Sequence, residues 1–272
     1  MRFAICNETF QDWPLARAMR FAGECGYEGI EFAPFTLGES ASAVPTEKRR
    51  EICRLAKTCG LEVVGLHWLL AKTSGYHLTS PDKLVRDRTA AYLRDLVRLC
   101  ADLGGKIMVF GSPQQRNILP SVSPQLAIDY AVEVFRSIGP DLQAADVTLA
   151  LEPLGPEETN FLQTAEETVD LIDLIGCDQF RLLLDCKAMS TEKHPIRDLI
   201  DRYQPWLAHF HANDPNRQGP GFGNLDFKSV FKALSRVEYA GWVSVEVFDY
   251  SPGVERLAKE SLRYMERCLE QI

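Results

Sequence analysis

Short apolar runs alternate with longer amphipathic stretches along the whole 272-residue chain. The apolar runs have the length of strands buried in a parallel sheet, and helix start and stop signals bound the stretches between them. The expected strands cover residues 2–10, 29–35, 61–70, 106–113, 147–152, 180–185, 206–211 and 242–247. The expected helices cover residues 14–25, 46–59, 80–103, 123–145, 164–175, 195–203, 226–237 and 254–269. Eight strands that alternate with eight helices predict an α/β fold, a single (β/α)8 TIM barrel over residues 1–272.

Four successive apolar runs, the fifth to the eighth, end in residues that can bind a metal. Glu152 follows VTLAL, Asp185 follows FRLLL, His211 lies in LAHFHAND, and Glu246 lies in WVSVEVFD. The intervals are 33, 26 and 35 residues (185−152, 211−185 and 246−211), about one βα unit each. Each residue alone is as easily explained as a helix cap or a partner of Lys. Because strand ends of a closed barrel converge on one mouth, the four together predict a site for a divalent ion: Mn²⁺, Mg²⁺ or Co²⁺.

Composition narrows the classes of protein that fit. The net charge is −8, which argues against a nucleic-acid partner because phosphate binding needs a basic face. The eight cysteines form no CxxC pair, so we expect reduced thiols in a cytoplasmic protein. No apolar run approaches the length of a membrane span, and the first expected strand leaves no room for a signal peptide. We expect no membrane partner and a homo-oligomer, either a dimer or a tetramer.

Several other polar residues lie near expected strand ends. Glu8 ends the first strand at the same mouth, where contact with a ligand is favoured. His67 ends the third strand and is either a substrate contact or a packing residue beside Trp68. Arg116 follows the fourth strand and either reaches a substrate oxygen or phosphate or forms an ion pair at the surface. These three residues are candidate substrate contacts.

Two further residues are expected inside the barrel. Glu31 lies within the second strand or near its end, and a buried carboxylate is stable there only with a partner. His209 lies on the same face of its strand as His211 but one layer deeper. We expect both residues to make hydrogen bonds in the interior.

Four segments of the second half of the chain resemble those of a known family. They are LEPLGPEETNFLQTAEE, LLLDCKAMS, HFHANDPNRQGPGFGNLDF and WVSVEVFDYSP. They resemble the sugar phosphate isomerase/epimerase family, which has a xylose isomerase-like barrel. Within that family they are most similar to the ketose epimerases of the D-tagatose 3-epimerase type.

The resemblance implies a role for each matching residue. Glu152, Asp185, His211 and Glu246 would bind one divalent metal, usually Mn²⁺. Glu152 and Glu246 would also act as the acid/base pair. Glu158 and Arg217 match positions that contact the oxygens of the sugar in the family.

The chain departs from these epimerases beside the metal aspartate. The family carries a His three residues after that Asp, and this chain has Ala188. Lys187 lies next to it. Strand alternation would aim Lys187 away from Asp185, so it reaches the site only if the chain leaves strand geometry there. Otherwise Lys187 turns outward and pairs with a carboxylate such as Glu192.

Four functions are compatible with this pattern. The first is a metal-dependent sugar isomerase or epimerase that removes a proton next to a carbonyl and forms an enediolate. A divalent ion would stabilise the charge of that enediolate as a Lewis acid. The second is a metal-dependent lyase or hydrolase that acts on a 3-keto sugar or glycoside. The third, an endonuclease IV-like repair enzyme, needs more histidine ligands than five His residues readily supply. The fourth, a non-catalytic binding protein, has no need of two flanking carboxylates.

Overall fold

The eight strands form one closed barrel. The computed structural model describes residues 1–272. The strands are β1 (Arg2–Cys6), β2 (Gly29–Phe32), β3 (Glu62–Leu66), β4 (Ile107–Phe110), β5 (Thr148–Leu151), β6 (Phe180–Asp185), β7 (Leu207–Ala212) and β8 (Trp242–Val245). Each strand pairs in parallel with the next one along the chain, and β8 pairs with β1. The predicted (β/α)8 barrel is therefore confirmed.

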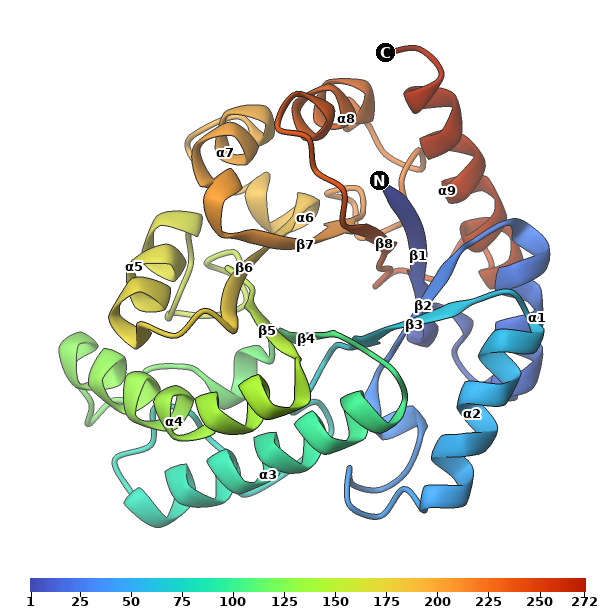
Figure 1. Cartoon of the computed structure of the whole chain (residues 1–272). Helices are drawn as coiled ribbons and strands as arrows, with labels where there is room; N and C mark the ends of the chain where they lie inside the picture. Colours follow the sequence, from blue (N-terminus) through green and yellow to red (C-terminus); the bar gives the residue numbers. More distant parts are fainter.

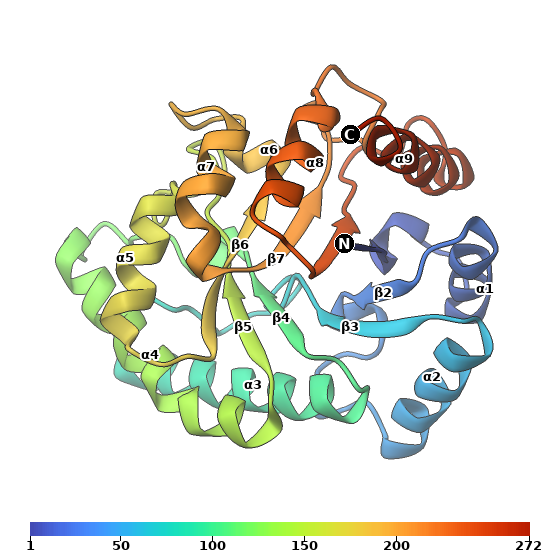
Figure 2. The ribbon, with the colours of Figure 1, turned by 45° about the horizontal axis from the view of Figure 1, so that its top comes forward.

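Helices surround the strands in chain order. They are α1 (Leu15–Cys25), α2 (Thr46–Thr58), α3 (Lys83–Asp102), α4 (Pro124–Ala145), α5 (Ala165–Ile175), α6 (Cys186–Met189), α7 (Ile196–Tyr203), α8 (Phe227–Arg236) and α9 (Val254–Leu269). Short 3₁₀ turns cover η1 (Asn7–Phe10), η2 (Pro34–Thr36), η3 (Pro113–Gln115) and η4 (Gln204–Trp206). Figure 1 shows the helices as a ring around the strands, with the red α9 closing the circle beside the blue α1. The tilted view in Figure 2 shows the same neighbours, so the last helix packs against the first part of the chain.

The apolar core has two parts, one inside the barrel and one between the strands and the surrounding helices. Alternate strand residues point into the barrel or outward against the helices, as the period of two requires. The strands are fully buried over most of their length because helices cover the outer face. At Gly65 a Cβ atom would lie 1.6 Å from the carbonyl oxygen of Ile107, so only glycine lets β3 and β4 approach this closely.

One α-helix was not predicted from the sequence. The helix α6 follows β6 without a loop, and Asp185 caps it by accepting a hydrogen bond from the Ala188 N–H. Four residues carry no helical periodicity, so the pattern of apolar positions gives no sign of this turn. None of the helices combines the length and the apolar character that a bilayer span needs.

Candidate functional site

Four strand ends bring the predicted metal ligands together. Glu152 follows β5, Asp185 ends β6, His211 lies in β7, and Glu246 follows β8. One ligand atom from each residue lies within 4.8 Å of the others, and all four side chains are buried. Residues spaced by about one βα unit along the chain therefore do come together at the mouth of the barrel.

Hydrogen bonds fix two of the three carboxylates. Asp185 accepts from Asn213 Nδ2 at 2.5 Å as well as from the main chain of α6. Glu246 lies 3.1 Å from His211 Nδ1 and accepts from Trp68 Nε1 at 2.7 Å. The carboxylate of Glu152 makes no such hydrogen bond, although Gly111 lies close against it. A Cβ atom at Gly111 would be 2.0 Å from Glu152 Oε2.

The electrostatics of the cluster fit a bound cation. Burial, together with the charges of Glu246 and Asp185, raises the pKa of Glu152 well above its ordinary value. Burial raises the pKa of Asp185 to about 6, although Lys187 lies near it. Burial also acts on Glu246, but His211 holds the pKa of that carboxyl below its usual range. Three carboxylates and one imidazole in so small a buried volume are the donor set of a divalent ion such as Mn²⁺.

A cavity of about 540 Å³ opens beside these ligands. Glu152 and Glu246 both line it, and so do Glu158 and Arg217, the two residues expected to contact a sugar. Its wall also includes Trp68 and Phe248, whose rings stack at 5.9 Å between centroids. Carboxylates, a guanidinium and aromatic faces around one cavity suit a small polar ligand.

Lys187 turns toward Glu158 and Phe248, two residues that line this cavity. The chain leaves strand geometry at Cys186, where α6 begins, and this turn redirects the next side chain. Lys187 Nζ lies 2.5 Å from Glu158 Oε2 and 4.7 Å from the centre of the Phe248 ring. The alternative pairing with Glu192 is wrong, because that carboxylate instead accepts from the main-chain N–H of Ala165.

Arg116 supports the main chain of the site. It is fully buried, so the predicted surface ion pair is wrong. Its guanidinium donates to the carbonyl oxygen of Glu152 at 2.6 Å and to that of Leu162 at 3.1 Å. It does not line the cavity, so its contact with a substrate stays a prediction. Arg116 braces the main chain that carries Glu152.

Glu8 and His67 form a buried pair behind Glu246. Glu8 Oε2 lies 2.5 Å from His67 Nε2. Glu8, His67 and Glu246 each offer one possible metal-ligand atom, and these atoms lie within 4.8 Å of one another. Neither lines the cavity, so their contact with a substrate stays a prediction. Glu31 and His209 were each expected to make a hydrogen bond in the interior, and they bond to each other at 2.8 Å.

The sequence analysis missed several residues that support the site. Trp68 donates to Glu246 with a main-chain φ of 52°, in the left-handed region that non-glycine residues rarely adopt. Asn213 holds Asp185, and Asp214 accepts from Gly221 N–H and Leu225 N–H, which shapes the glycine-rich loop. The polar segment after β7 could have pointed to Asn213 and Asp214, but no local sequence pattern points to Trp68.

The chain is similar to known sugar epimerases in sequence and in fold. The chain is 26% identical to L-ribulose 3-epimerase of Mesorhizobium japonicum over 247 residues, which cover 91% of this chain and 80% of that protein. A crystal structure of D-psicose 3-epimerase with D-tagatose, from Clostridium cellulolyticum, superposes with a TM-score of 0.88 at 20% identity and covers 99% of both chains. A 3-keto-D-glucoside 4-epimerase from E. coli superposes with a TM-score of 0.84 at 20% identity, and covers 98% of this chain and all of that one.

Residues 19–268 also match a family that is described as a xylose isomerase-like TIM barrel. This segment includes strands β2 to β8 and all four clustered ligands. The chain therefore belongs to the xylose isomerase-like TIM barrel family.

Proposed function

We propose that this protein is a divalent-metal-dependent sugar epimerase that acts on a ketose and inverts the carbon next to its carbonyl. One observation carries the proposal: Glu152 and Glu246 both line the cavity and both belong to the ligand cluster. The names of the related proteins, L-ribulose 3-epimerase and D-psicose 3-epimerase, support the same class of reaction.

The chemistry requires two proton-transfer groups and a means to stabilise negative charge. A bound divalent ion would supply Lewis-acid stabilisation of charge on the sugar oxygens. Glu152 and Glu246 enter from different strands, so one can remove the proton from the substrate carbon and the other can return one to the opposite face. Positioned acid/base groups typically contribute about 10²–10⁴-fold in rate.

Other residues of the cavity would orient the sugar. The guanidinium of Arg217 can donate hydrogen bonds to hydroxyl groups, and Glu158 can accept them. Lys187 neutralises Glu158 and fixes its position. The stacked rings of Trp68 and Phe248 present an apolar wall that limits the access of water to the reacting carbon.

We expect Mn²⁺ to be the native ion, with Mg²⁺ or Co²⁺ as alternatives, and a homodimer or homotetramer in the cytoplasm. Elemental analysis of the purified protein would identify the ion. Light scattering coupled to size exclusion would give the number of subunits, and a monomer would contradict the oligomer prediction.

The test is a hydrogen-exchange screen. L-ribulose, D-psicose, D-tagatose and D-fructose are incubated with the protein and Mn²⁺ in D₂O, and NMR reports which C–H bond exchanges and which epimer forms. Glu152→Gln and Glu246→Gln should each lower kcat by at least about 10²-fold. Glu157→Gln is the matched control, because Glu157 is an exposed carboxylate in the same loop as Glu158. Unchanged turnover in either of the first two variants would contradict the two-carboxylate mechanism.

A second candidate is cleavage of a 3-keto sugar or glycoside. Proton removal next to the ketone would form a carbon–carbon double bond and expel the oxygen substituent of the neighbouring carbon. Lys187 favours this candidate, because its ammonium group is held against Glu158, which lines the cavity, and the chain has Ala188 where the resemblance implies a His. Mass spectrometry separates the two reactions, since epimerisation conserves the substrate mass and cleavage yields two products.

A further inference from the structure

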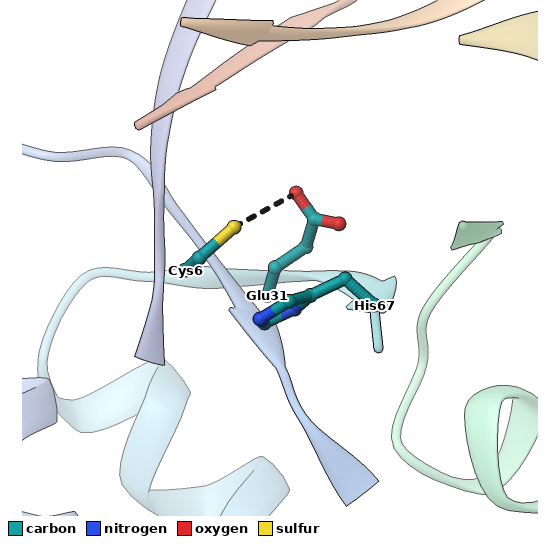
Figure 3. A group of neighbouring side chains, drawn as sticks. All are labelled: Cys6, Glu31 and His67. Carbon is teal, nitrogen blue, oxygen red and sulfur yellow. Dashed lines mark hydrogen bonds between the residues drawn. The ribbon is translucent and has the colours of Figure 1, made fainter. Parts of the chain in front are cut away.

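Glu31 lies at the centre of a buried hydrogen-bonded cluster beneath the metal ligands. It belongs to β2 and is fully buried inside the barrel. Its Oε2 atom lies 2.8 Å from His209 Nε2, 3.4 Å from His211 Nε2 and 3.8 Å from Cys6 Sγ. Figure 3 shows Cys6 and His67 gathered beside this carboxylate, with the contact to Cys6 drawn as a dashed line. Glu31 Oε2 therefore contacts three side chains, which come from two other strands.

The imidazole of His211 lies between two carboxylates. Its Nδ1 atom is 3.1 Å from Glu246 Oε2, and its Nε2 atom is 3.4 Å from Glu31 Oε2. Glu246 belongs to the four-residue ligand cluster, and Glu31 belongs to a second group of possible ligands, with His209 and His211. Nδ1 is therefore the nitrogen that faces the proposed ion, and Nε2 faces the barrel interior.

A neutral imidazole carries its proton on one nitrogen only, and the other nitrogen offers the lone pair. If Nδ1 is to offer its lone pair to a metal, Nε2 must hold the proton, and a buried N–H needs an acceptor. Nε2 makes no hydrogen bond in this structure, and its ion-pair contact is with the Glu31 carboxylate, at 3.4 Å. A carboxylate placed behind a metal-binding His fixes both the tautomer and the orientation of the ring.

We propose that Glu31 is a positioning residue that holds His211 with Nδ1 aimed at the metal. The inference rests on the proposed metal site. His209 completes the arrangement, because its contact with the same oxygen restricts the rotation of the Glu31 side chain. A carboxylate buried without any exposure is costly, and these neighbours explain how the barrel interior tolerates it.

A rival role for the same cluster is direct metal binding. Cys6, Glu31 and His67 each offer one ligand atom, and these atoms lie within 4.8 Å of one another. His67 Nδ1 and Glu31 Oε1 have no hydrogen-bond partner. Against this role, His67 is already paired through Nε2 with Glu8 at 2.5 Å, and three donors leave a zinc-like site one ligand short. The number of ions bound per chain decides between the two roles.

The experiment compares Glu31→Gln with the wild-type protein after removal of metal by a chelator. Free Mn²⁺ is measured by electron paramagnetic resonance during titration, which gives Kd and the number of sites. We expect one site per chain and a 10–100-fold weaker Kd in the variant, the usual effect of losing a carboxylate behind a metal-binding His. Cys6→Ala is the matched control, because it removes another partner of Glu31 Oε2 and leaves the contact with His211 in place. Its Kd should change less than twofold.

A second readout reports the tautomer directly. In protein labelled with ¹⁵N at histidine and loaded with diamagnetic Mg²⁺, long-range ¹H–¹⁵N spectra should show His211 with its proton on Nε2. In Glu31→Gln the signal should shift toward a mixture of tautomers, which a merely structural role would not produce.

Three results would overturn the inference. They are an unchanged Kd with an unchanged tautomer in Glu31→Gln, two Mn²⁺ ions per wild-type chain of which the variant loses one, and a proton on Nδ1 of His211 in the loaded wild-type protein. The last measurement needs no variant, so the inference stays testable even if Glu31→Gln does not fold. Wild-type protein that binds no Mn²⁺ would contradict the proposed metal site itself, and this inference would fail with it.

Discussion

Trp68→Phe isolates a single hydrogen bond at the proposed acid/base residue. The indole Nε1 of Trp68 donates to Glu246 Oε1 at 2.7 Å. Phe keeps the aromatic stack with Phe248 and removes only the donor. Position 68 has a left-handed φ of 52°, which strains Phe as it strains Trp. The backbone strain is therefore present in both proteins and cancels in the comparison.

The size of the effect follows from the charge of the acceptor. A hydrogen bond to a charged group contributes about 1.5–3 kcal/mol, and about 1.4 kcal/mol corresponds to a tenfold change in rate. Losing the bond leaves Glu246 less well oriented and raises its pKa, because the donor stabilises the ionised carboxylate. We therefore expect kcat to fall by about 10–150-fold, while KM and the melting temperature change little.

The assay is steady-state epimerisation of a ketose that the wild-type protein converts, with calorimetry on the same samples. Phe35→Leu is the control, because the Phe35 ring lies 6.0 Å from that of Trp68 and contacts no carboxylate of the site. Its kcat should change less than about threefold. Wild-type kcat in Trp68→Phe would show that this hydrogen bond does not orient Glu246 for proton transfer.

Three further predictions test other parts of the site. Lys187→Met should raise KM for the sugar about tenfold, because Glu158 loses its ion-pair partner. The melting temperature should change little, and a change in stability without a change in KM would contradict a binding role. Arg116→Met should destabilise the protein by about 1–3 kcal/mol in urea unfolding, because the buried carbonyl group of Glu152 loses its donor, whereas that of Leu162 keeps the N–H of Leu154. Exposed Arg197→Met is its control, and equal effects would contradict the bracing role. Mn²⁺ affinity should fall as the pH drops below about 6. Protons then compete for Asp185, whose pKa burial raises to about 6, and for Glu152, whose pKa is also raised by burial. Calorimetric titrations from pH 5 to 8 would refute this reasoning if the affinity stayed constant.

The fold was predictable because each stretch of the chain carries its own signal. A period of two or a short apolar run marks a strand, and the capped amphipathic stretches mark the helices, so eight βα units can be counted before any contact is known. The ends of the elements were less accurate. The third strand was expected to reach residue 70, but β3 ends at Leu66, and the positive φ of Trp68 lies beyond it. Nothing in the local sequence requires that turn.

The clustering of the four proposed metal ligands was predictable because their positions are local properties of the strands. Glu152 and Asp185 come directly after apolar runs, and the barrel topology alone brings such ends together. The direction of Lys187 and the burial of Arg116 were not predictable in this way. Lys187 depends on the turn that Asp185 caps, and Arg116 depends on carbonyl groups 36 and 46 residues further along the chain.

The two glutamates of the proposed acid/base pair are held in different ways. Glu246 is fixed through its side chain, between the donor of Trp68 and the ring of His211. The Glu152 carboxylate makes no hydrogen bond, and only its main chain is held, by Arg116. A fixed carboxylate suits a constant position beside the ion. A free carboxylate on an anchored main chain suits a group that must move between metal, substrate and proton. The barrel thus holds one carboxylate through its side chain and the other only through its main chain, an arrangement that suits the proposed two-carboxylate mechanism.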